Sequence, residues 1–278
     1  MKIILTIFLL ATSFLQSVHA EDILPKKSEL DLGVGYGTGS VPHYPASNQN
    51  QNESLFLPVI MYRGDVLKSD REEGTRVELF KSLELDINLS FGATFSSDSS
   101  ENEARRNMPN LNYTLETGPA IYFKFWSVPD YGSLRLQIPI RLTFETNFKT
   151  TNFLGFVFEP ELRFQRLNFL IPNLRSSTSV ASEFFSERVA NYFYEVEPQY
   201  VTADRPAYTG HDGLSAFKLS QNFIYEYEKF SFILGTAYSN FSYSANKNSP
   251  LFKSVHNQSY FLAVAWLFYK SESIALTD

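Results

Sequence analysis

The clearest pattern in the chain is alternation of apolar and polar positions. Every second residue is apolar from Leu83 to Phe95 and again from Leu134 to Phe144. Successive side chains of a β-strand point to opposite faces, so each run predicts a strand with one apolar and one polar face. Looser runs of the same kind occur at 30–36, 55–63, 113–125, 154–165, 217–227, 230–238 and 260–268, and weaker ones at 75–80 and 175–184.

The length of these runs favours a membrane barrel over a soluble β-sheet protein. Most span roughly 9 to 13 residues, enough for a tilted strand to cross the hydrocarbon layer and longer than the 5 to 6 typical of soluble strands. A soluble barrel also alternates and remains the alternative, although it would have to pack many Phe and Tyr side chains into one lumen. If the apolar faces meet lipid, the interior receives Glu84, Asp86, Glu116, Lys124, Arg135, Arg141, Glu159, Glu161 and Arg163.

The connections between the runs alternate between short and long, which predicts the orientation. Residues 127–133, 167–173 and 228–229 are short links, whereas 96–112, 185–213 and 244–257 are long. Outer-membrane barrels keep their periplasmic turns short and place long loops outside, with aromatic residues at the strand ends. We therefore predict an all-β, antiparallel, up-and-down transmembrane barrel with both termini in the periplasm. The eleven candidate runs indicate twelve strands, with ten as the alternative.

The first twenty residues have the pattern of an export signal. Lys2 precedes an apolar stretch, and Val18-His19-Ala20 fits a small-x-small cleavage site. A retained membrane anchor is the alternative for this segment. The expected organisation is a cleaved signal peptide at 1–20, a periplasmic segment at 21–29, the barrel at 30–269 and a tail at 270–278.

Composition narrows the classes of function. The chain has no Cys, so disulfides, thiolate metal sites and cysteine nucleophiles are excluded. Its formal net charge of -6 leaves no basic footprint for nucleic acid. At 44% hydrophobic and 16% aromatic residues it is too apolar for a disordered protein.

Only weak candidates for chemistry are present, and we expect no enzyme, cofactor or resident metal. His43, His211 and His256 are the histidines beyond the signal segment, and His211-Asp212 lies close to Ser215. A serine nucleophile needs an imidazole base and a third group that orients the imidazole. Ser215 would lie at the start of the same strand that His211 leads into, and this is poor geometry for a nucleophile and its base.

Two other groups of residues were considered for binding. Asp98, Glu101 and Glu103 have the ligand type for a divalent cation, and Arg105-Arg106 could bind lipopolysaccharide phosphates; a solvated loop with internal ion pairs is the alternative. Gly33, Gly35, Gly37 and Gly39 alternate with larger residues without a following helix, so they predict space on a lumen face and no phosphate site.

Three loop segments have a distinctive residue pattern. They are the stretch Ser99 to Leu111 with its Ala-Arg-x-x-Met-Pro pattern, the segment Tyr192-Phe193-Tyr194-Glu195-Val196, and Arg205-Pro206-Ala207-Tyr208 followed by Gly213-Leu214. Together they resemble the MipA/OmpV family of outer-membrane proteins. The layout is similar from Leu30 to Phe268. Asn107 and Tyr194 stand where the family pattern has Gly, and the chain continues ten residues past Phe268.

The resemblance implies an interaction role at the outer membrane of a Gram-negative cell. Family members are described as scaffolds that bring a murein-cleaving lytic transglycosylase together with a bifunctional penicillin-binding protein, and some as adhesion or permeability proteins. A scaffold is therefore our first expectation, with a small-solute pore or a surface adhesin as the alternatives. Outer-membrane lipid, lipopolysaccharide and the two periplasmic enzymes are the partners it implies.

Overall fold

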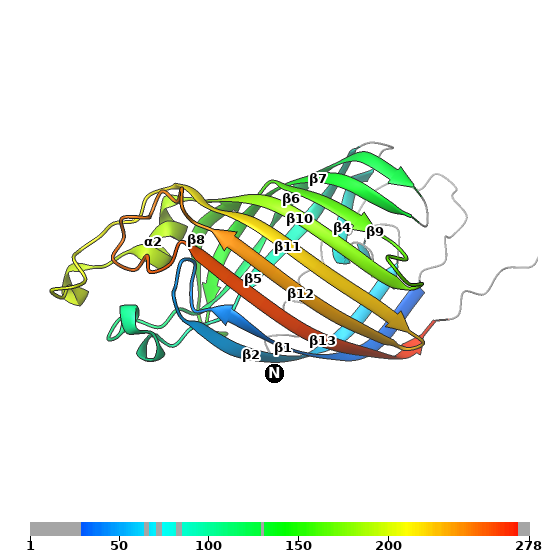
Figure 1. The fold of residues 1–278 in the computed structure, drawn as a ribbon, viewed down its shortest axis with the longest axis horizontal. Helices are drawn as coiled ribbons and strands as arrows, with labels where there is room; N and C mark the ends of the chain where they lie inside the picture. Colours follow the sequence, from blue (N-terminus) through cyan, green and yellow to red (C-terminus); the bar gives the residue numbers. More distant parts are fainter. Residues whose placement is uncertain (1–28, 64–66, 71–73, 82–84, 129–130, 272–278) are drawn as a thin grey trace, which may run out of the picture.

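The computed structural model describes residues 29–63, 67–70, 74–81, 85–128 and 131–271, and these form one antiparallel β-sheet (Figure 1). The sheet has 13 strand segments. Their bounds are β1 Glu29–Pro42, β2 Asn50–Arg63, β3 Leu67–Asp70, β4 Gly74–Lys81, β5 Leu85–Thr94, β6 Tyr113–Val128, β7 Gly132–Thr146, β8 Thr151–Phe158, β9 Glu161–Arg166, β10 Leu174–Phe185, β11 Gly213–Tyr227, β12 Phe230–Asn240 and β13 His256–Lys270.

The sheet closes on itself as a barrel. Most neighbours in the chain pair with each other, while the first strand, β1, pairs with the last, β13, over ten residue pairs from Asp31↔Lys270 to Ser40↔Tyr260. Closure removes the free edges that an open sheet would expose. The expected class, an all-β antiparallel up-and-down barrel, is confirmed at this level.

One predicted strand is divided in two. The run at 154–165 becomes β8 and β9, separated by Glu159 and Pro160, because proline has no N–H to donate to the ladder. Both pieces lie between the same neighbours, since each pairs with β7 and with β10. The segment count therefore does not by itself decide the number of membrane crossings, and twelve stays a prediction.

The other predicted runs correspond to observed strands, and one observed strand was not predicted. The weak runs at 75–80 and 175–184 correspond to β4 and β10, and the four-residue β3 was not predicted. Several strands are longer than expected: β6 has 16 residues and β7, β11 and β13 have 15 each. They extend beyond the roughly 9 to 11 residues that cross a bilayer because their ends continue into the loops.

The two ends of the barrel differ, as the loop lengths predicted. One end, here called the turn end, has the short connections and the start of β1 and finish of β13. The other, the capped end, has all the long loops, at the left of Figure 1. These loops contain the short helices η1 Ser99–Glu101, η2 Glu103–Arg105, α2 Glu187–Tyr194 and η3 Pro198–Tyr200. None of the helices in the described part of the chain has the length and apolarity to cross a membrane.

The outer surface of the barrel is apolar. Phe56 is 66% exposed and Leu262 59%, and Phe125, Ile140 and Leu234 are exposed as well. Near the turn end, Tyr227 pairs with Phe230 and Phe230 with Trp266, whose rings lie 6.5 Å apart. The exposed faces have the arrangement expected where strands meet lipid, with aromatic residues at the boundary.

The predicted signal peptide at 1–20 lies outside the described residues, together with most of the 21–29 and 270–278 segments. Glu84 lies outside them too. The boundaries of these segments stay predictions.

Candidate functional site

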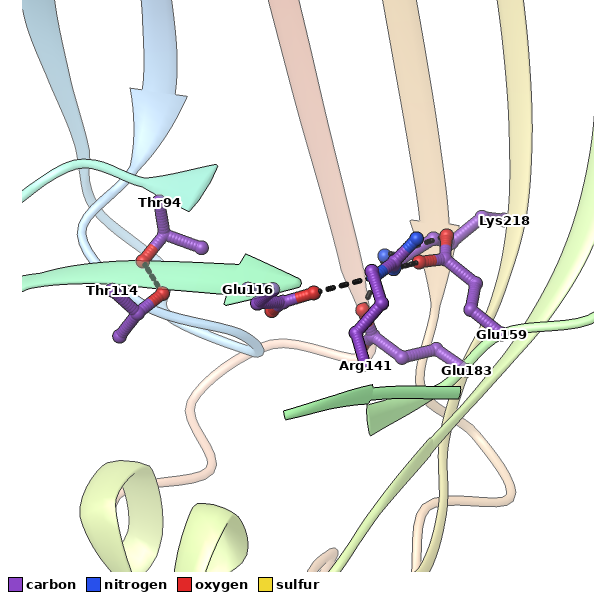
Figure 2. A network of polar contacts seen from close by, with 7 residues as sticks. All are labelled: Thr94, Thr114, Glu116, Arg141, Glu159, Glu183 and Lys218. Atoms are coloured by element: carbon purple, nitrogen blue, oxygen red, sulfur yellow. Dashed lines mark hydrogen bonds and ion pairs between the residues drawn. The ribbon is translucent and has the colours of Figure 1, made fainter. Parts of the chain in front are cut away.

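A network of charged side chains lines the interior wall near the capped end (Figure 2). Arg141 on β7 donates from Nε to Glu116 on β6 at 2.8 Å, and from Nη2 to Glu159 between β8 and β9. Lys218 on β11 contacts Glu159 at 3.2 Å and also binds Glu183 on β10. Five successive strand positions are thus joined from the inside by one chain of opposite charges.

Further ion pairs line the same part of the wall toward the turn end. They are Lys124–Asp86 at 2.7 Å, Arg163–Glu161 at 2.6 Å and Arg175–Glu226 at 3.4 Å, while Arg135 donates to Gln165 at 3.1 Å. Of the charges assigned to the interior from the alternating pattern, those in the described part of the chain do face it, and Glu84 lies outside that part. The same alternation could also have predicted Lys218 and Glu183, which lie at inward positions of β11 and β10.

The loops of the capped end pack into a hydrophobic core of their own. Its centre is α2, whose Val189, Ala190 and Phe193 are buried and whose Tyr194 is 0% exposed. Tyr44, between β1 and β2, donates its hydroxyl to the carbonyl oxygen of Leu251 at 2.8 Å, and burial raises the pKa of Tyr44 to about 12. The long loops are therefore one folded cap over the barrel mouth, which sequence periodicity did not predict.

The three family-like segments meet inside this cap. Arg105 in the first donates to the carbonyl of Phe193 in the second at 3.3 Å. Arg205 in the third donates to the carbonyls of Ala104 and Arg106 in the first, at 2.8 and 3.1 Å. Val196 and Tyr208 exchange backbone hydrogen bonds of 2.9 and 3.1 Å. The residues that carry the resemblance therefore build the cap.

The proposal that Arg105 contacts lipopolysaccharide phosphate is wrong. Arg105 is 4% exposed, and besides Phe193 it donates to Ser99 Oγ at 3.3 Å and to the Pro109 carbonyl at 3.2 Å. Burial lowers the pKa of Arg105 to about 10, because the charged guanidinium is removed from water. Arg106 is exposed.

The two departures from the family pattern have different structural settings. Asn107 has φ of 66°, the left-handed region that glycine and asparagine tolerate best, which explains why either residue fits there. Tyr194, at the second position where the sequence pattern led us to expect glycine, is fully buried in the cap.

The weak candidates for catalysis and metal binding do not assemble. His211 is exposed, with its ring against Tyr208, whereas Ser215 is 1% exposed and points inside. His43 contacts Ser97 Oγ at 3.0 Å and His256 contacts the Tyr238 hydroxyl at 2.6 Å. In the part of the chain that the structure describes, no three His, Asp or Glu side chains are placed to hold a metal ion.

Asp98 caps a short helix and is not part of a cation site. It caps η1 by accepting from the backbone N–H of Ser100 at 2.8 Å, a hydrogen bond that lowers the pKa of Asp98. Asp98, Glu101 and Glu103 therefore do not form the cation site considered from the sequence.

A closed antiparallel barrel with an apolar outside, a charged inside and folded loops at one end is a protein of the outer-membrane β-barrel class. Paired charges line part of its interior wall, and a cap covers its mouth. Within this class, the chain belongs to the MipA family: the family model of MltA-interacting protein MipA matches residues 34–268. The family's description names an interaction and no reaction.

Comparison with solved structures gives distant likenesses. A bacterial polysaccharide outer membrane secretin aligns with a TM-score of 0.39 and 9% identity, covering 86% of this chain and 98% of that one. Outer membrane phospholipase A from Escherichia coli gives 0.32 and 8%, covering 85% and 92%, and the protease OmpT from the same organism 0.32 and 9%, covering 91% and 100%. Likenesses this distant say nothing about function. No curated protein matches the chain by sequence.

Proposed function

We propose that this protein is an outer-membrane anchor that holds murein enzymes at the membrane from the periplasmic side. The observation that carries the proposal is the covered mouth: a folded cap lies over one end of the barrel, and beneath it the network from Glu116 to Lys218 joins the strands. A barrel closed in this way suits an anchor better than an open pore. The family's description as MltA-interacting supports a murein-cleaving transglycosylase as one partner, with a penicillin-binding protein as the second.

The orientation follows from the two different ends. We place the capped end outside the cell and the turn end in the periplasm, because outer-membrane barrels have long external loops. We also count β8 and β9 as one crossing, since they share the position between β7 and β10. This gives twelve crossings, an even number that leaves both chain ends in the periplasm after removal of the 1–20 signal peptide.

The periplasmic contact surface has to come mainly from the chain ends. Short turns do not make a standard interface of about 800 Å² per partner. Residues 21–28 and 271–278 are the available supplement, and both carry mixed charge: Lys26 and Lys27 near Glu21 and Asp22, and Glu272 with Asp278 beyond Lys270. Binding through such segments weakens as salt rises.

Affinity capture from a periplasmic extract tests the proposal. The intact purified barrel should retain a lytic transglycosylase or a penicillin-binding protein, identified by mass spectrometry. A variant without 21–28 and 271–278 should retain less, and this deletion spares β13, which runs to Lys270. Arg106→Ala at the exposed cap is the matched control and should bind like wild type. Capture of neither enzyme by the intact barrel would rule out the anchor.

A further inference from the structure

The barrel interior has a second wall that is very different from the charged one. β12, β13, β1 and β2 are neighbours in the sheet. Their inward positions hold small and apolar residues, among them Gly35, Gly37, Ala263, Leu55 and Leu57. The interiors of membrane barrels are normally polar. Strands that are apolar on both faces are typical of sheets covered on both sides.

The register of the sheet establishes that these residues face inward. Side chains directly opposite each other in an antiparallel pair lie on the same face. Starting from Lys218 in the interior network, the pairs run Lys218↔Ser239, Ser239↔Asn257 and, four residues further along β13, Phe261↔Gly39 and Gly39↔Glu53. Two and four residues from Gly39 come Gly37↔Leu55 and Gly35↔Leu57. The apolar wall is therefore on the lumen side.

A cavity of about 380 Å³ lies against this wall. It is lined by Leu55, Leu57, Val59, Ile233, Phe261 and Ala263 together with the bare backbone of the glycine positions. The volume is within the range of small-molecule sites, roughly 300–1,000 Å³. Leu57 is 50% exposed and Phe261 41%, although both point into the barrel. Apolar area left open inside a barrel favours an apolar occupant over water.

One charged side chain lies at the edge of the cavity. Glu53 lines it at the end nearer the cap. Each carboxylate of the interior network has a cationic partner, whereas the carboxylate of Glu53 makes no ion pair or hydrogen bond with another described residue. A charge beside apolar surface is stabilised by an opposite charge. The site thus combines a long apolar surface with one anionic end.

We propose that the lumen binds an amphiphile with a single alkyl chain and a cationic head group. The chain lies along Leu55, Leu57 and Phe261 on the apolar wall, and the head group pairs with the Glu53 carboxylate. This site is independent of the periplasmic contacts of the anchor, because it lies inside the barrel and uses no terminal segment.

Photolabelling of the barrel in phosphatidylcholine nanodiscs tests this site. The probe is dodecylamine with a diazirine at the chain end, compared with the dodecanoic acid and dodecanol analogues. The readout is the ratio of labelling at the inward Leu57 and Phe261 to labelling at the outward Phe56 and Leu262, so that partition into lipid cancels. The amine should give an inward-to-outward ratio about tenfold above that of the acid, because its head group carries the opposite charge to Glu53.

Two variants separate the chain site from the head-group site. Ala263→Leu narrows the cavity of about 380 Å³ and should lower inward labelling by all three probes, whereas Val264→Leu, the outward neighbour, should leave it unchanged. Glu53→Gln should bring the amine and acid ratios together while inward labelling persists. Folding of each variant is checked by its heat-dependent mobility in gels.

Several results would overturn the proposal. The cavity site would be ruled out if wild type showed no inward labelling, or if folded Ala263→Leu kept the same inward-to-outward ratio as wild type. A preference for the acid, or an amine preference unchanged in Glu53→Gln, would remove the cationic head group. None of these results depends on capture of murein enzymes, so the two proposals fail separately.

Discussion

At the scale of single residues, two buried arginines hold the cap together. Arg105 and Arg205 donate mainly to backbone carbonyls of the loops, in other segments at Phe193 and Ala104 and within the same segment at Pro109. Guanidinium groups suit this task because one side chain offers five donors in a fixed plane. The Ala-Arg-x-x-Met-Pro pattern is thus a feature of loop folding.

Replacing Arg105 should loosen the cap. Arg105→Leu removes the donor to the Phe193 carbonyl and to Ser99 Oγ, at roughly 1–3 kcal/mol for an acceptor left unpaired, while the Pro109 carbonyl still accepts from Ser99 Oγ. The cap should be cleaved faster by protease added to whole cells, while the barrel strands stay protected. Arg106→Leu, at the exposed neighbour, should behave like wild type. Equal cleavage of the two variants would contradict the structural role of Arg105.

Two glycines of β1 should respond differently to the same substitution. A Cβ added at Gly39 would lie 2.4 Å from the Tyr260 carbonyl oxygen, whereas at Gly37 its nearest atom is Ala263 Cβ at 3.2 Å. Gly39→Ala should therefore destabilise the barrel by about 1–3 kcal/mol and Gly37→Ala by clearly less. Urea unfolding followed by tryptophan fluorescence measures both, and the reverse order would argue against this register of β1 and β13.

At the scale of elements, alternation predicts strands well because it reports directly which face meets lipid. It identifies β5 and β7, with Leu85 to Thr94 and Gly132 to Thr146 close to the expected runs. It does not predict the cap, because α2 is stabilised by tertiary packing of Val189 and Phe193 and is only 8 residues long. The division of the run at 154–165 could have been predicted from Pro160, since proline interrupts the hydrogen bonds of a strand ladder.

The candidate site was predictable only in part. The inward charges follow from period two, but their pairing depends on register: Arg141 reaches Glu116 and Glu159 because β6, β7 and the β8–β9 junction bring them to one level. The burial of Arg105 and the apolar wall at Leu55 and Leu57 depend on three-dimensional packing, which a single sequence does not show.

The two faces of β7 should tolerate a new charge differently. Ile140 is exposed on the outer surface, so Ile140→Arg should cost roughly 2–4 kcal/mol near the membrane midplane. Gln137→Arg, which faces the lumen on the same strand, is the control and should cost less. The measurement is unfolding in lipid vesicles by denaturant. A larger cost for Gln137→Arg would mean that the faces are reversed.

At the scale of the whole molecule, the two ends of the barrel have different proposed roles. The cap covers the external end, and the turn end faces the periplasmic partners. The orientation can be measured with one cysteine, since the chain has none of its own. Arg106→Cys should react with an impermeant thiol reagent on intact cells. Reaction only after the outer membrane is permeabilised would reverse the orientation.

The central claim is that this barrel is a closed anchor, and ion conductance tests it most directly. The purified wild-type protein is inserted into a planar lipid bilayer, and insertion is confirmed on a separate vesicle sample by protease cleavage of the cap. Because the cap covers the mouth and the ion pairs of Arg141, Glu159 and Lys218 line the wall beneath it, we expect no resolved conductance steps. Stable, repeated steps from the intact barrel would contradict the closed interior and favour the small-solute pore.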